Sequence, residues 1–106
     1  MRVAILVEAG AVPPPPDQLP MLLQAFAHWR DKWREKMEVF AFWAGRQGGL
    51  GVLNVADESE LSQMMFEFPL NPFSTVEARP IVDGDEALQR LTQTINQMLA
   101  QMQGPG

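Results

Sequence analysis

The alternation of apolar and polar positions along the chain predicts four strands and three helices. An apolar run rich in β-branched residues predicts a buried strand, and a run of prolines follows it as a stiff connector. Apolar residues that recur every three or four positions then predict an amphipathic helix. Two further strand-like runs flank a glycine-containing turn, which is typical of an antiparallel hairpin. In order, these segments are a strand over 2–8, a helix over 18–36, and strands over 38–46 and 49–55.

The hairpin and the second half of the chain carry local signals at their turns. Gly48 and Gly49 can adopt the positive φ angles of a tight turn. Asp57, followed three positions later by Glu60, predicts the N-cap of a second helix, which Pro69 ends.

The remaining sequence predicts one more strand and one more helix. The strand over 73–82 contains Pro80, which predicts that its far end lies at a sheet edge or a bulge. Apolar residues on one face and glutamine and threonine on the other predict a third amphipathic helix over 83–102.

This order of elements predicts an α+β, ferredoxin-like βαββαβ fold, with two helices on one face of a four-stranded antiparallel sheet. We expect a single domain over 1–106, made of a core over 1–82 and a C-terminal helical extension over 83–102. The second face of such a sheet is left open. An apolar open face predicts a homodimer or a higher homo-oligomer.

Composition and charge narrow the classes of function. The 106-residue chain has no cysteine and one histidine, which excludes disulfides, thiolate nucleophiles and cysteine- or histidine-rich metal sites. Its net charge of -5 disfavours nucleic acid and anionic membrane surfaces as partners. The apolar run at the N-terminus is too short for a signal peptide or a membrane span, so we expect a cytoplasmic location.

Three stretches of the sequence are similar to those of a known family. The segments "AGRQGGLGVLNV", "FPLNPF" and "STVEARPIV" resemble the muconolactone isomerase family, with Ala44 and Gly45 ending the second strand and a double-proline motif before the last strand. The resemblance implies a ferredoxin-like protomer in a dimeric α/β barrel that assembles into rings. It also implies cofactor-free proton transfer on a small unsaturated lactone.

The same resemblance assigns positions to chemistry. The family uses a carboxylate on the first helix, and the positions here that best match it are Phe26, Trp29 and Arg30. The family's tyrosine falls on Gln47 and its small polar residue on Gly49, and the chain contains no tyrosine. The sequence therefore departs from the family at the positions that carry its chemistry.

Candidate site residues lie on the first helix and on the hairpin. Arg30 borders the aromatic face of the helix, where it can bind a substrate carboxylate, or instead extend to water or pair with an acid. Gln47 can polarise a carbonyl group, and Arg46 lies beside it. The candidate walls of a binding pocket, which are equally consistent with plain core, are Phe26, Trp29 and Trp33.

Two further titratable residues, Glu77 and His28, are candidates for acid–base chemistry. Glu77 is the alternative carboxylate, and alternation puts it on the same side of the last strand as Arg79, where both also suit an ion-pair network at a dimer interface. His28 lies about 160° from Phe26 on a helical wheel, which favours an exposed or oligomer-contact position.

These observations favour a muconolactone isomerase-like enzyme that transfers a proton on a small lactone-like or carboxylated molecule, with no cofactor and no metal. Arg30, Gln47 and Glu77 are its candidate catalytic residues. One alternative is a non-catalytic small-molecule-binding or assembly protein on the same scaffold. A third is a cofactor-independent monooxygenase, which rests on analogy of fold.

Overall fold

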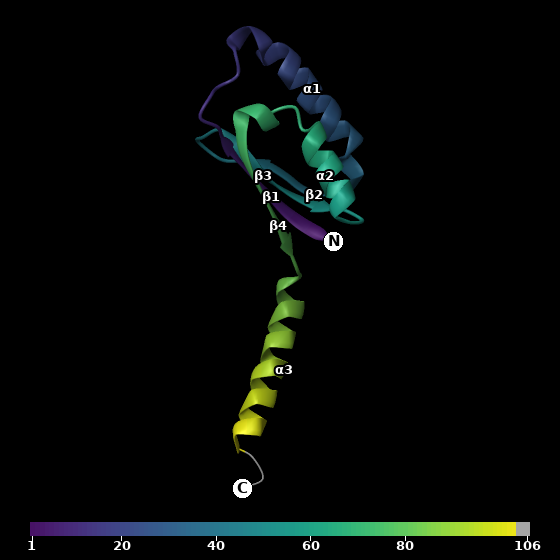
Figure 1. Cartoon of the computed structure of the whole chain (residues 1–106), viewed down its shortest axis with the longest axis vertical. Helices are drawn as coiled ribbons and strands as arrows, with labels where there is room; N and C mark the ends of the chain where they lie inside the picture. The colour runs from purple at the N-terminus through teal and green to yellow at the C-terminus, as the bar shows by residue number, and fades with distance from the viewer. Residues whose placement is uncertain (104–106) are drawn as a thin grey trace.

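The computed structural model describes residues 1–103, which form one four-stranded antiparallel sheet and three α-helices (Figure 1). The strand order is β2-β3-β1-β4, which confirms the predicted ferredoxin-like α+β fold. β4 lies at an edge, so Pro80 interrupts no central ladder, as predicted. The elements are β1 (Arg2–Ala9), α1 (Leu19–Lys32), β2 (Met37–Phe42), β3 (Gly48–Asn54), α2 (Glu58–Glu67), β4 (Ser74–Ile81) and α3 (Gly84–Gln103).

The hairpin between β2 and β3 differs from its prediction. Gly45 and Gly48 adopt positive φ angles of 79° and 105°, and Gly49 does not, so the prediction for Gly49 is wrong. β2 ends at Phe42 because the chain leaves the sheet there for a wider turn, closed by a 3.0 Å hydrogen bond from the Trp43 N–H to the Gly48 carbonyl. Gly49 is needed for another reason: a Cβ there would lie 2.3 Å from the Ala41 carbonyl oxygen.

The hydrophobic core lies between the sheet and the two helices α1 and α2. Side chains alternate along β1, so Val3 and Ile5 point into this core. The indole N–H of Trp29 donates a 2.9 Å hydrogen bond to the Met64 carbonyl, which ties α1 to α2 inside the core. Among the described residues, the buried side chains of this core are those of Val3, Ile5, Trp29, Trp33, Leu53, Val55, Met64 and Phe68.

The start of α2 is fixed by the predicted cap. The Asp57 carboxylate accepts a 2.9 Å hydrogen bond from the Glu60 N–H, which confirms Asp57 as the N-cap. Glu60 in turn accepts from the Ala56 N–H at 3.0 Å and from the Lys36 ammonium at 2.7 Å. The helix ends at Glu67, before Pro69, as predicted.

Acid is expected to destabilise the fold through Glu60. The hydrogen bond from Lys36, and after it that from the Ala56 N–H, lowers the pKa of Glu60 below its ordinary value. A carboxylate whose pKa is lowered on folding stabilises the folded state above its ordinary pKa, near 4.3, and this contribution is lost as the pH falls through the lowered value. Glu60→Gln should therefore make the melting temperature less dependent on pH between about 5 and 3. Thermal unfolding followed by circular dichroism across that range measures this effect.

The control for this experiment is Glu35→Gln. Glu35 is exposed and makes neither of these two hydrogen bonds. If both substitutions flatten the pH dependence equally, the Lys36 and Ala56 contacts are not its cause.

The other face of the sheet is also apolar at its centre. Leu6 lies opposite Leu50, and Ala4 lies opposite Val52, all on the side away from the core. α1 and α2 both lie on the core side (Figure 1). At one end of the open face, Glu38 accepts hydrogen bonds from Arg2 and Asn54. The open face is thus an apolar patch with a polar border.

The helix α3 confirms the predicted C-terminal extension and stands apart from the rest of the fold. It continues from the end of β4 and projects away from the sheet (Figure 1). It contains no buried residue, and the apolar stripe along one of its sides is exposed. This stripe consists of Leu88, Leu91, Ile95, Met98, Leu99 and Met102. Among the described residues, no helix combines the length and apolar character that crossing a bilayer requires.

Candidate active site

A cavity of about 410 Å³ lies between α1 and the sheet. Its floor is formed by the core-facing residues of three strands, and its roof by the apolar face of α1. Gly51 sits at the centre of the floor, between Ile5 on β1 and Phe40 on β2. Because glycine has no side chain, this central floor position adds no atoms above the backbone, and the space above it is open.

Aromatic rings form the walls of the cavity. The ring of Phe26 lies 5.9 Å from that of Trp29 and 5.6 Å from that of Phe68. On the sheet side it lies 5.8 Å from Phe40 and 6.2 Å from Phe42. Rings in this arrangement present both faces and edges, which suits contact with a flat apolar molecule.

The charged, amide and hydroxyl side chains that line the cavity lie at one end of it. Glu8, Arg46, Gln47 and Ser74 lie where β1 ends, β4 begins and the hairpin turns. The Arg46 guanidinium donates a 3.0 Å hydrogen bond to the Glu8 carboxylate. Both side chains are partly exposed, so this end of the cavity meets solvent.

The Trp43 ring of the hairpin contacts Arg46 and positions its guanidinium. The Arg46 guanidinium carbon lies 5.2 Å from the centre of the Trp43 ring, a cation–π distance. The Trp43 indole N–H donates a 3.0 Å hydrogen bond to the Val7 carbonyl. The ring is therefore fixed to β1, and it positions the guanidinium beside Glu8.

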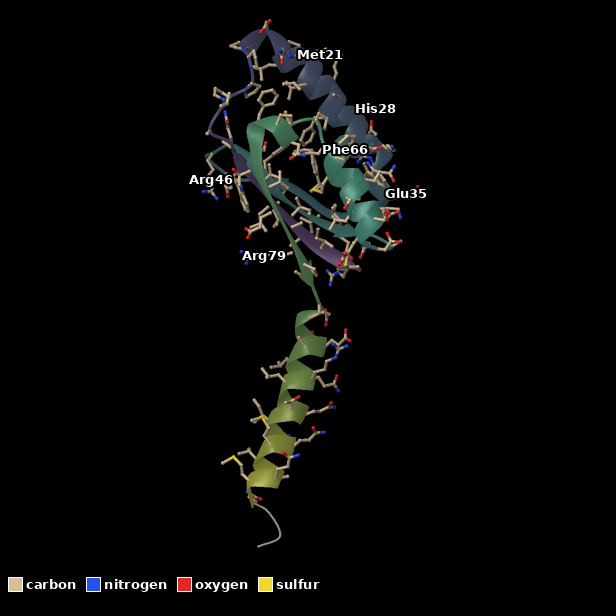
Figure 2. The ribbon with its side chains drawn as sticks, viewed as in Figure 1. Met21, His28, Glu35, Arg46, Phe66 and Arg79 are labelled. Atoms are coloured by element: carbon tan, nitrogen blue, oxygen red, sulfur yellow. The ribbon has the colours of Figure 1, made fainter. Side chains whose placement is uncertain are left out.

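Four of the candidate residues predicted from sequence line this cavity: Phe26, Trp29, Arg46 and Gln47. The structure brings them together from α1 and the hairpin. Arg46 lies at the hairpin end of the molecule, far from Glu35 in Figure 2.

The other three candidates lie outside the cavity lining. The guanidinium carbon of Arg30 lies over the Phe40 ring, 4.6 Å from the ring centre. Trp33 is buried in the core, and its indole N–H donates a 3.1 Å hydrogen bond to Glu67. Glu77 is exposed on β4 and pairs with Arg79 on the same strand.

His28 points outward from α1 (Figure 2) and is exposed. This placement agrees with the helical wheel. It leaves the cavity without a histidine, since His28 is the one histidine of the chain.

Glu8 is the functional candidate that sequence reasoning missed. It is the carboxylate of the cavity lining, and it lies at the end of β1, where the neighbouring hairpin carries Arg46. Val7 packs against the core, so alternation along β1 turns the Glu8 side chain toward the open face of the sheet, and Glu8 borders the cavity at its rim, where the strand ends. The available signal was its position: Glu8 is the first charged residue after the apolar run of the strand.

Four carboxylates outside the cavity have lowered pKa values because they accept hydrogen bonds within the fold. The pKa values of Asp31, Glu38, Glu60 and Glu67 are lowered, chiefly by hydrogen bonds from Arg34, Asn54, Lys36 and Lys32 respectively, and none of these carboxylates lines the cavity. Within residues 1–103, no group of three or more histidine, cysteine, aspartate or glutamate residues is arranged to hold a metal ion.

No protein-family model matches this sequence, and no curated protein is similar to it in sequence. Its structure, however, is similar to solved structures, two of which are those of an isomerase and a dehydrochlorinase. Muconolactone isomerase superposes with a TM-score of 0.69 and 15% identity, over 78% of this chain and 90% of the other. The 5-chloro-2-hydroxyhydroquinone dehydrochlorinase TftG of Burkholderia phenoliruptrix AC1100, solved with 2,5-dihydroxybenzoquinone, has a TM-score of 0.59 and 13% identity, over 81% and 98%. The chain therefore has the muconolactone isomerase-like fold that its hairpin and double-proline motif indicate.

Proposed function

We propose that this protein is a small-molecule enzyme that moves a proton on a substrate held in the cavity, and that it does so without a cofactor. The observation that carries the proposal is the cavity itself, whose aromatic walls end in a carboxylate, a guanidinium and an amide. The names of the two similar structures, an isomerase and a dehydrochlorinase, agree with small-molecule chemistry on this fold.

Glu8 is the proposed general base, and because it lies at the rim of the cavity, the reacting carbon of the substrate must lie at that rim. Its carboxylate takes a proton from a carbon next to a carbonyl group, and the electron pair left behind forms an enolate. Returning the proton to another carbon of the conjugated system shifts the double bond and restores Glu8. The reaction is balanced, because the proton that leaves one carbon is replaced at another.

Gln47 and Arg46 are the proposed partners of this base. The Gln47 amide donates a hydrogen bond to the carbonyl oxygen, which carries the negative charge of the enolate. Arg46 holds Glu8 through its 3.0 Å hydrogen bond and supplies positive charge at the same end of the cavity. In this scheme Arg46 takes the anchoring part that the sequence assigned to Arg30.

Deuterium incorporation tests the proposal. The protein is incubated in D₂O with unsaturated lactones and cyclic enones, and label on carbon is followed by NMR. Enzyme-dependent incorporation at a carbon next to the carbonyl supports proton transfer. Saturable binding without incorporation would instead identify a binding protein, and enzyme-dependent oxygen consumption would identify a monooxygenase.

We also propose that a second copy of the chain covers the open sheet face and the apolar stripe of α3. The chain exposes 7754 Å², whereas a compact monomer of 11.9 kDa exposes about 6,000 Å². Its radius of gyration is 19.6 Å, against about 13 Å for a compact chain of this length.

The excess of exposed surface area over that of a compact monomer is of the size that an obligate homodimer buries. If two chains each buried their excess of roughly 1,800 Å², the interface would total about 3,600 Å², within the range of about 2,000–5,000 Å² for obligate homodimers. Most of the exposed apolar stripe lies in the part of α3 from Leu91 onward, which carries no charged residue. An uncharged helix face suits contact with a second copy of itself better than contact with an acidic or basic partner.

A further inference from the structure

We infer that the cavity takes a fused two- or three-ring molecule whose oxygen atoms lie along one edge, rather than a single-ring lactone. The inference rests on the proposed function in that it concerns the same cavity. Three independent observations carry it: the size of the cavity, the one-ended distribution of its polar groups, and the glycine in its floor.

The size of the cavity exceeds what a single ring fills. At the packing density of protein interiors, about 0.75, and with about 15 Å³ per non-hydrogen atom, 410 Å³ holds on the order of twenty non-hydrogen atoms. A single-ring lactone with an acid arm has about half that number. It would leave much of the aromatic wall without contacts, whereas a fused-ring molecule would fill it.

The distribution of polar groups sets where the oxygens of the ligand lie. Glu8, Arg46, Gln47 and Ser74 all lie at the same end. At the other end the Trp29 indole N–H already donates to the Met64 carbonyl. In the part of the chain that the structure describes, no buried polar side-chain atom is left without a partner. A ligand oxygen at that deep end would lose its hydrogen bonds to water and gain none, so ligands with oxygens on opposite edges are disfavoured.

Gly51 makes the floor deep enough for a second ring. A Cβ atom at this position would meet only the Val39 carbonyl oxygen at 3.6 Å and a Leu53 methyl at 3.9 Å, which are ordinary contacts. The backbone therefore does not require glycine here, in contrast to Gly49, where a Cβ would clash. A side chain at position 51 would instead project from the floor into the cavity.

A matched pair of probes tests the inference. 2-Naphthoic acid and benzoic acid carry the same carboxylate and differ by one fused ring. We expect the wild-type protein to bind 2-naphthoic acid at least about tenfold more tightly, because the second ring buries apolar surface. Isothermal titration calorimetry measures both dissociation constants. Equal affinities, or no binding of 2-naphthoic acid, would overturn the inference.

The variant Gly51→Leu tests the position of the second ring. It should weaken the binding of 2-naphthoic acid more than the binding of benzoic acid, and so remove the advantage of the fused ring. Gly84→Leu is the matched control, since a Cβ there meets nothing within 4 Å and Gly84 lies outside the cavity. If Gly51→Leu, with an unchanged circular dichroism spectrum, still binds 2-naphthoic acid as the wild type does, the ring does not lie over Gly51 and the inference fails.

The proposed function and this inference fail in different experiments. Proton exchange on single-ring substrates, together with no preference for 2-naphthoic acid, would support the proposed function and contradict the fused-ring ligand. The opposite outcome is a preference for 2-naphthoic acid that Gly51→Leu abolishes, with no exchange on fused-ring ketones. It would support the fused-ring ligand and contradict proton transfer.

Discussion

Glu8→Gln is expected to slow proton exchange by about 10²- to 10⁴-fold, the usual contribution of a positioned general base. The amide has nearly the shape of the carboxylate, and its oxygen can still accept from Arg46. It cannot take up a proton at neutral pH, so chemistry should be lost while substrate binding is largely kept. The measurement is the initial rate of deuterium incorporation at several substrate concentrations, with kcat expected to fall far more than KM changes.

Two other carboxylates serve as comparisons for Glu8. Glu58→Gln is the control for a lost surface charge, because Glu58 is exposed on α2 and lies outside the cavity lining. Glu77→Gln tests the carboxylate that the sequence offered as the alternative base. If Glu77→Gln abolishes exchange and Glu8→Gln does not, the base lies on β4, and the proposed site is incorrect.

The second large effect concerns assembly. If the proposed homo-oligomer forms, replacing both Leu91 and Ile95 with glutamine should convert it into a species of 11.9 kDa. Each buried aliphatic side chain contributes about 1.5–3 kcal/mol, and a two-fold interface loses every such contact twice. The dissociation constant should therefore rise by at least about 10³-fold. Sedimentation equilibrium over a range of protein concentrations measures this change.

The matched control carries two substitutions on the opposite side of α3. Gln93→Ala with Gln97→Ala alters the polar side of the helix and leaves the apolar stripe intact. Alanine and glutamine are both good helix formers, so each double variant should keep α3 helical. A wild-type protein that stays monomeric at high micromolar concentration would contradict the second copy, whatever the variants do.

The fold was predictable because each element carries its own local signal. The Asp57 cap, the Pro69 stop and the edge position of Pro80 all depend on residues close in sequence, and the structure agrees with each. The conformations of the hairpin glycines were harder to predict. A Gly-Gly pair marks a turn, but which glycine takes a positive φ depends on the length of the turn, and which one avoids a clash depends on the neighbouring strand.

The candidate site was predictable only in part, because it combines segments that are far apart in the chain. Phe26 and Trp29 followed from the helical stripe, and Arg46 and Gln47 from the hairpin of a resembling family. Glu8 did not, since its place beside Arg46 comes from the pairing of β1 with β3.

Arg30 shows the complementary limit of a helical wheel. The wheel gives the direction of a side chain relative to its own helix, and Arg30 does border the aromatic face. Its guanidinium nevertheless lies over the ring of Phe40 on β2 and outside the cavity lining, a contact that the helix alone does not predict.

The placement of the three tryptophans gives this protein a built-in optical signal. The chain has no tyrosine, so its near-ultraviolet emission comes almost entirely from Trp29, Trp33 and Trp43. Of these, only Trp29 borders the cavity, and its indole is held by the Met64 carbonyl. Quenching or a spectral shift on adding a ligand would therefore originate at Trp29 in the cavity wall and at Trp43, whose ring lies 5.2 Å from the Arg46 guanidinium, and occupancy could be followed by fluorescence without any attached dye.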